Sequence, residues 1–249
     1  MIHTFLLKRF WHLRQRFIST IAFIILLPVI VFLTISTGMK NIIMETMGNI
    51  SYEEWVYPGL IMIINTIIIA PIIFRDFYYL RLESKTLATL SLAPLSKFQI
   101  ISYLIISTII EGVTLSLFSI FILSYLMGVS MGVLSFTYTI IAVFLFSLII
   151  SNALTTLSLS TNRINNIFIG STIITLFFFY SSELLIEFEF YPKSVIGIFK
   201  FLPTSMISNW YRAMVFQGEF KVDLFFIPLF ISLIWIFLNS LLLKRVLRQ

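Results

Sequence analysis

Six long apolar segments, separated by short polar connections, constrain this chain more than any other feature of its sequence. A helix needs about 20 mostly apolar residues to cross the hydrocarbon core of a bilayer. The segments that meet this requirement are Phe17–Met39, Val56–Phe74, Phe98–Met127, Leu134–Leu159, Ile164–Tyr180 and Leu224–Leu243. With only 11% charged residues, the chain has too little polar surface to cover a water-soluble globule. We therefore predict an all-α membrane protein with six transmembrane helices, forming a single domain over residues 1–249.

The distribution of basic residues predicts the orientation of these helices. Lysine and arginine are enriched in the short loops on the cytosolic side of a membrane. Of the 17 basic residues, 12 lie in the two termini and in the connections that follow the second and fourth segments. The other three connections hold the remaining five, together with eight of the 11 acidic residues. Both termini are therefore predicted to be cytosolic.

Several classes of enzyme are disfavoured by missing residues. The chain has no cysteine, which rules out disulfides and thiolate metal sites, and its two histidines precede the first apolar segment. It has no GxxxxGKS or GxxxxGKT loop for binding phosphate and no His–Glu metal motif. We predict that the chain is not an enzyme and holds no catalytic, cofactor-binding or metal-binding residues. Because the basic residues flank the spans, the net charge of +6 gives no reason to expect a nucleic-acid partner.

The residues before the first segment form a separate amphipathic pattern. On a helical wheel one face carries Leu6, Leu7, Phe10, Trp11, Leu13 and Phe17, and the other carries Lys8, Arg9, His12, Gln15 and Arg16. Phe5 and Arg14 are exceptions, although a long arginine side chain can reach toward the headgroups. We predict an interfacial helix that lies in the plane of the membrane. The alternative is an ordinary positive flank that only sets orientation.

The connection Ser181–Asp223 is too long for a turn and too apolar for a solvated loop. It contains two short apolar stretches, Ser194–Phe201 and Met206–Phe216, separated by Leu202-Pro203. Apolar runs of about 10–14 residues are often re-entrant or interfacial. Irregular backbone at membrane depth must be covered by protein or water. We predict a re-entrant helical pair on the outer side, and a helical cap on the outer surface is the alternative.

Polar side chains inside the apolar segments are candidates for a transport pathway. Glu111 lies about 13 residues into the third segment, which places it roughly 20 Å deep at 1.5 Å per residue. A charge at that depth is costly and points to function. The alternative is a neutral carboxyl that is hydrogen-bonded to a Ser, Thr or Asn of a neighbouring helix. Asn65 and Asn152 are further pathway candidates, although hydrogen bonding between helices is the simpler interpretation of both.

The stretch Arg81–Pro94, between the second and third segments, has the pattern of an amphipathic helix outside the membrane. Leu80, Leu87 and Leu90 share one face with Glu83, whereas Arg81, Lys85 and Ala88 lie opposite. Pro94 ends the helix, because the residue before a proline is pushed out of the helical region. Leucines with mixed charge fit the groove of a partner protein better than a membrane surface. We therefore predict a cytosolic coupling helix that docks into another protein.

Residues in three regions resemble those of ABC-2 permeases, the membrane subunits of type 2 ABC exporters. After the second span the chain has Arg81, Glu83, Thr86-Leu87, Leu90 and Pro94-Leu95-Ser96, and at the start of that span it has Tyr57-Pro58-Gly59-Leu60. On the outer side it has Phe201-Leu202-Pro203-Thr204-Ser205, followed by Arg212 and Gly218. The chain departs from the family at three places: Lys85 and Ala88 replace a glycine and an acid, and Ser102-Tyr103 replaces a Gly-Lys or Gly-Glu pair.

The resemblance implies a permease subunit of an ATP-driven exporter in the cytoplasmic (inner) membrane of a prokaryote. Two copies, or one copy and a paralogue, would join two ATP-binding cassette subunits that hold ATP and Mg. The sequence most resembles the permeases of drug and lipo-oligosaccharide exporters, so an amphipathic or lipid-linked cargo is expected. The implied ATPase-docking residues are Arg81, Glu83, Lys85, Thr86, Leu87, Leu90 and Pro94, and the implied outer gate is Pro203, Trp210, Arg212 and Gly218. A secondary transporter or channel, and a non-transporting membrane scaffold, are the alternatives.

Overall fold

The computed structural model describes residues 2–40, 50–90 and 94–247, and within these ranges it contains helices and no strand. Six helical stretches of the described chain are long and apolar enough to cross a membrane. They are Phe17–Met39, Tyr52–Leu82, Lys97–Met127, Val133–Ser160, Ile164–Ser181 and Val222–Val246. The prediction of an all-α fold with six apolar helices is therefore confirmed, and the second helix extends further at both ends than its apolar core indicated.

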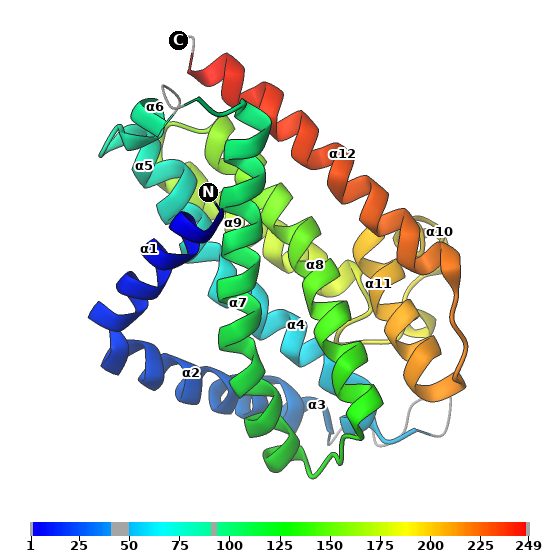
Figure 1. The fold of residues 1–249 in the computed structure, drawn as a ribbon. Coiled ribbons are helices and arrows are strands. Elements are labelled where there is room, and N and C mark those ends of the chain that lie inside the picture. Colours follow the sequence, from blue (N-terminus) through cyan, green and yellow to red (C-terminus); the bar gives the residue numbers. More distant parts are fainter. Residues whose placement is uncertain (1, 41–49, 91–93, 248–249) are drawn as a thin grey trace.

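The helices follow one another with few long connections (Figure 1). The first half of the chain forms α1 (Ile2–Gln15), α2 (Phe17–Val31), α3 (Thr37–Lys40), α4 (Tyr52–Ile73), α5 (Leu80–Leu82) and α6 (Thr86–Leu90). The second half forms α7 (Lys97–Met127), α8 (Val133–Ser160), α9 (Ile164–Ser181), α10 (Lys193–Phe199), α11 (Pro203–Arg212) and α12 (Val222–Val246). Wider π-helical turns cover Phe32–Ser36, Phe74–Tyr79 and Ala213–Gln217, and a 3-10 turn covers Phe188–Phe190.

Local sequence explains where the long helices begin and end. Ser96 caps α7, because its hydroxyl accepts a hydrogen bond from the Gln99 backbone at 3.1 Å and the Gln99 side chain accepts one from the Ser96 backbone at 3.0 Å. Gly128 ends α7 with a φ of +67°, a conformation that glycine adopts without strain. Ser51 caps α4 by accepting from the backbone of Glu54 at 3.3 Å.

The helix α4 is the centre of the bundle. Its neighbours are α7 and α8, and 83% of its most apolar stretch is buried, whereas only 17% of the corresponding stretch of α2 is buried. Figure 1 shows α2 at the margin of the bundle, with α1 leaving it at a sharp corner. The core is therefore built on α4, and α2 offers most of its surface to the surroundings.

The predicted outer pair forms two short helices of different character. α11 begins at Pro203, three residues before the predicted stretch Met206–Phe216, and packs against α8 and α12, with Ile207, Trp210 and Tyr211 buried. No residue of α10 is buried. One member of the pair is therefore part of the bundle and the other lies on its surface, so the two stretches do not form a symmetrical pair.

Candidate functional site

Four charged side chains gather where α1, α7 and the turn after α4 meet. Arg9 of α1 forms ion pairs with Asp76 of the turn and with Glu111 of α7. Arg75 lies beside them, with Nε 3.1 Å from Asp76 Oδ1 and Nη2 3.5 Å from Glu111 Oε2. Arg9 also donates to the hydroxyl of Thr108 at 2.7 Å. We call Arg9, Arg75, Asp76 and Glu111 the Arg9 cluster.

The Arg9 cluster is balanced in charge and almost closed to solvent. Arg9, Asp76 and Glu111 are 6%, 5% and 7% exposed, whereas the side chain of Arg75 is 34% exposed. A buried charge is tolerated only when an opposite charge and further hydrogen bonds satisfy it. Two guanidinium groups facing two carboxylates meet that requirement, so the cluster holds α1 against α7 and against the end of α4.

This arrangement corrects two expectations from the sequence. Glu111 contacts two arginines, and not the Ser, Thr or Asn of the alternative neutral arrangement. Arg9, placed on the polar face of α1, points inward, while Phe10 and Trp11 of the expected apolar face are exposed. The inward face is the line Phe5, Arg9 and Leu13, spaced four residues apart, and the ring of Phe5 packs 6.1 Å from that of Tyr103.

The length of α7 bears on the position of Glu111. α7 has 31 residues, about 46 Å at 1.5 Å per residue, which exceeds the ~30 Å hydrocarbon core. Part of α7 must therefore project beyond the core. Glu111 shares Arg9 with Asp76, which lies in the turn before α5. Glu111 therefore lies beside the turn that follows α4.

The predicted continuous helix Arg81–Pro94 is interrupted. α5 ends at Leu82 and α6 begins at Thr86, with Lys85 between them at a φ of +54°, a left-handed conformation that is costly for a residue with a side chain. Residues 91–93 lie outside the described residues. Glu83, Ser84, Lys85, Thr86 and Pro94 are exposed. We call Glu83–Thr86 the exposed segment.

Three of the predicted docking residues do not lie on this exposed surface. Arg81 is buried and donates to the carbonyls of Leu159 and Thr161, and to Asn162 Oδ1 at 3.1 Å. Leu87 has no exposed surface and packs in the core of its own chain, and Leu90 is half-buried against that core. The expectation that Leu87 is a free anchor for a partner is therefore wrong, because this chain already covers it.

The four predicted gate residues all belong to α11 and its ends. Pro203 is the first residue of α11, Trp210 is 1% exposed, and Gly218 ends the following turn with a φ of +69°. Arg212 lies with its guanidinium 3.9 Å above the ring of Trp55 and with Nη1 3.1 Å from Glu183 Oε2. It also donates to the Glu183 carbonyl. We call Arg212, Glu183 and Trp55 the Arg212 clamp.

Burial dominates the electrostatics of the Arg212 clamp. It lowers the pKa of Arg212 to about 10, although Glu183 acts in the opposite direction. Burial likewise raises the pKa of Glu183 above its ordinary value, against the opposing effect of Arg212. Arg212 therefore remains charged near neutral pH. The cost of burying both charged groups offsets part of the stabilisation that their attraction provides.

The two arginine sites lie at opposite ends of α4. Trp55 stands near its start and Asp76 just after its end. Asp76 is 21 steps along the chain from Trp55, which corresponds to about 32 Å of helix, close to the ~30 Å thickness of the hydrocarbon core. The two sites are therefore separated along α4 by about the thickness of the hydrocarbon core.

The two buried asparagines connect helices. Asn65 of α4 donates to Ser147 of α8 at 2.5 Å. Asn152 of α8 donates to the Ser232 carbonyl of α12 at 3.3 Å, and it accepts from Asn239 at 3.1 Å. Both side chains have no exposed surface. These contacts fit the interpretation of interhelical hydrogen bonds and give no direct support to a pathway role.

No hydrolase or metal site is apparent among the described residues. Ser130 stands in a Gly-x-Ser-x-Gly pattern between Gly128 and Gly132, but it occupies an exposed turn between two helices. The nucleophile of that motif needs a strand before the turn. In the described part of the chain no three His, Asp or Glu side chains gather to hold a metal ion.

Comparison with known proteins adds no relative. No family model, no curated protein and no solved structure matches this chain.

Proposed function

We propose that this chain is the membrane-spanning permease subunit of an ATP-driven exporter that moves an amphipathic or lipid-linked substrate out of the cell. The observation that carries this proposal is the exposed segment Glu83–Thr86, set between two long apolar helices. It is short, carries one negative and one positive side chain, and includes Lys85 in a left-handed conformation. Such a feature fits a docking site for a soluble protein, here the ATP-binding subunit.

The exposed segment is connected to the spanning helices by rigid contacts. On one side Arg81 fixes it to the connection between α8 and α9, and Tyr78 donates to the Asn162 carbonyl at 3.2 Å. On the other side the π-helical turn Phe74–Tyr79 leads directly into α4, and Asp76 within it belongs to the Arg9 cluster. Short π-helical insertions often occur at functional sites. Movement of the segment by a partner would therefore reach α1, α4 and α7 together.

The source of energy and the pathway both require further subunits in this proposal. ATP and Mg would be held by the ATP-binding subunit. The described helices bury most of the apolar part of α4 at the centre, so the substrate path is assigned to the boundary with a second permease copy or paralogue. The Arg212 clamp fits a gate near the outer end, since it holds α11 against the start of α4.

A proton-coupled secondary transporter is a second candidate, and the Arg9 cluster is the observation that favours it. Ionisable residues within spanning helices are typical of ion and proton pathways. The structure adds Asp76 beside Glu111, so the chain has two buried carboxylates in one place. Transport that persists without ATP and follows a proton gradient would identify this function instead.

The direct experiment is purification of the chain from native membranes in mild detergent, followed by measurement of the ATP hydrolysis that accompanies it. The double change Glu83→Lys with Lys85→Glu reverses both charges of the exposed segment and keeps the net charge. It should lower the accompanying ATP hydrolysis at least tenfold, which corresponds to about 1.4 kcal/mol of docking energy. The wild-type chain purifying without any ATPase would contradict the proposal.

The matched control is Glu219→Lys with Lys221→Glu. These residues form an exposed pair 3.7 Å apart at the start of α12, away from the exposed segment. The control should keep full ATP hydrolysis. Equal loss in both variants would show a general effect of charge and not a docking site.

A further inference from the structure

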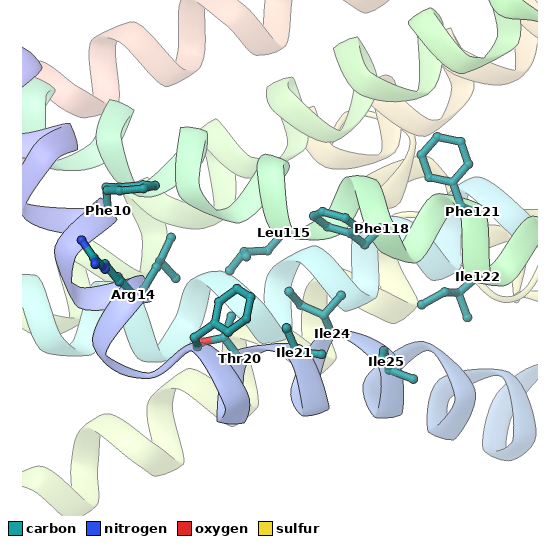
Figure 2. Close-up of a pocket in the computed structure, with 12 residues that line it drawn as sticks. Phe10, Arg14, Thr20, Ile21, Ile24, Ile25, Leu115, Phe118, Phe121 and Ile122 are labelled. Atoms are coloured by element: carbon teal, nitrogen blue, oxygen red, sulfur yellow. The ribbon is translucent and has the colours of Figure 1, made fainter.

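A groove lies between α2 and α7 and is closed at one end by α1 (Figure 2). Its volume is about 690 Å³, within the range of about 300–1,000 Å³ that is usual for sites that bind small molecules. Its walls are almost entirely apolar, and Ile24 of α2 is 9% exposed at its base. Phe118 and Phe121 of α7 line the groove and are 55% and 63% exposed.

The charge of the groove is confined to one end. Figure 2 shows Arg14 at the α1 end, with Phe121 and Ile122 at the opposite end. Arg14 is exposed, and Arg16 stands exposed at the corner just beyond it. None of the described residues that line the groove is acidic. The groove thus has an apolar body and a single cationic end.

The length of the groove matches one leaflet of a bilayer. Along α2 its lining runs from Phe17 to Ile25, which are eight steps apart along the helix, or about 12 Å at 1.5 Å per residue. The hydrocarbon of one leaflet is about 15 Å thick, half of the ~30 Å core. One lipid chain can therefore lie along the groove with its headgroup beside Arg14.

We propose that this groove binds one anionic phospholipid, with an acyl chain between α2 and α7 and the phosphate at Arg14. An arginine at the boundary of the hydrocarbon can keep its stem in the apolar layer and its guanidinium at the headgroup. Basic side chains at this level attract anionic lipids. The bound lipid would fill the space that keeps α2 apart from the bundle, whatever the chain transports.

A second copy of the chain is a less favourable occupant. Copies related by a two-fold axis along the membrane normal place the same residues at the same depth. Arg14 and Arg16 of one copy would then stand at the level of Arg14 and Arg16 of the other, without an acidic side chain among those that line the groove. A lipid phosphate removes this repulsion, and a second copy does not.

The test is native mass spectrometry of the full chain from micelles that hold equal amounts of phosphatidylglycerol and phosphatidylcholine. The wild-type chain should retain one phosphatidylglycerol in preference to phosphatidylcholine. Arg14→Gln should lower that preference about fivefold, the factor for one basic side chain near an anionic headgroup. Arg16→Gln, outside the groove, should change it less. Equal preference in all three chains would overturn the proposal.

A second pair of variants separates the groove from lipid bound elsewhere. Ile21→Trp fills the groove from α2 and should reduce retention of both lipids severalfold. Ile18 is 85% exposed on the same helix and does not line the groove. Ile18→Trp should therefore retain both lipids as the wild type does. Unchanged retention in Ile21→Trp would contradict the site.

A cysteine in place of Phe118 tests whether a second copy of the chain occupies the groove. The chain has no native cysteine, so a disulfide formed by Phe118→Cys on oxidation in membranes can only join two copies. We expect no such dimer, because lipid covers the position. Its formation in good yield would assign the groove to a second copy and overturn the lipid proposal.

Discussion

Both ends of α4 are held by an arginine that comes from another helix, but the two arginines meet different partners. Arg9 faces two carboxylates, Asp76 and Glu111, with Arg75 as a second cation. Arg212 divides its contacts among one carboxylate, one backbone carbonyl and the ring of Trp55. Each arginine also has a neutral acceptor, Thr108 for Arg9 and the Glu183 carbonyl for Arg212. The first site, however, holds two carboxylates, whereas the second holds one carboxylate and an aromatic ring.

This difference decides what remains when the arginine is removed. The side chains of Asp76 and Glu111 are 8% and 5% exposed, so two carboxylates would stay buried with only the partly exposed Arg75 beside them. Glu183 is 13% exposed and would be the single carboxylate left by the loss of Arg212. An uncompensated buried charge costs more than the loss of an attraction. The two ends of α4 should therefore respond to the same substitution with different losses of stability.

Arg9→Ala is expected to have the largest effect. Breaking a buried ion pair by removing one partner costs about 3–5 kcal/mol, and here two anions lose their main partner. The thermal transition of the purified chain in detergent should fall accordingly. Arg16→Ala is the matched control, because Arg16 is exposed at the end of α1 and should change stability by less than about 0.5 kcal/mol. Equal transitions for both variants would show that the Arg9 cluster does not hold α1.

The Arg9 cluster shows where sequence reasoning ends. The six apolar helices follow from local composition, because each needs only its own residues to satisfy the length of the membrane. Arg9 pairs with residues 67 and 102 positions away, and no local pattern reveals such a contact. One signal was available: Phe5 did not fit the predicted faces of α1, and Arg9 stands one helical turn after it. The inward line through Phe5, Arg9 and Leu13 explains that exception.

The exposed segment shows a second limit. Helical periodicity predicted a continuous helix with Leu87 on its docking face. Leu80 and Leu87 share one face because both pack against their own chain, and Leu87 is fully buried. A single sequence cannot tell a leucine that packs against its own chain from one that packs against a partner. The break at Lys85 was equally hidden, because a lysine gives no sign of a left-handed backbone.

A glycine beside each arginine site sharpens the comparison. A Cβ at Gly59 would stand 2.2 Å from the backbone oxygen of Leu184, next to Glu183, whereas a Cβ at Gly112, next to Glu111, would stand 2.5 Å from the side chain of Ile69. Backbone cannot move aside as a side-chain end can. Gly59→Ala should therefore cost about 3 kcal/mol by overpacking, and Gly112→Ala about 1 kcal/mol, partly offset by the helix propensity of alanine. Thermal transitions of the two variants in the same detergent measure which one loses more stability. A larger loss for Gly112→Ala would contradict this view of the packing.

Arg212→Met is expected to have a smaller effect than Arg9→Ala. Methionine keeps much of the apolar volume over Trp55 but loses the ion pair, the hydrogen bond to the Glu183 carbonyl and the attraction to the ring. A cation above an aromatic ring contributes about 0.5–2 kcal/mol, and a typical hydrogen bond about 1 kcal/mol. We expect a loss of about 2 kcal/mol in the free energy of unfolding. A loss as large as that of Arg9→Ala would show that the two sites are equivalent in spite of their different partners.

The smallest expected effect is the dependence of the Arg212 clamp on pH. Burial raises the pKa of Glu183 above its ordinary value, so the folded chain holds this proton more tightly than the unfolded chain does. The stability from this source is fully present below the ordinary pKa of glutamate and is lost as pH rises through the raised pKa. Arg212, with its pKa lowered to about 10, stays charged throughout this range and does not titrate with Glu183.

The pH dependence is measured as the difference in thermal transition between the wild-type chain and Glu183→Gln, over the range from mildly acidic to neutral pH. Glutamine keeps the shape of the side chain and cannot ionise. The wild type should lose stability relative to the variant as pH rises, and the difference should level off above the raised pKa of Glu183. Glu219→Gln, at an exposed position, controls for charge and should give no such slope. A slope of the opposite sign would mean that attraction to Arg212 outweighs burial, so that the Arg212 clamp is held together by charge in the same way as the Arg9 cluster.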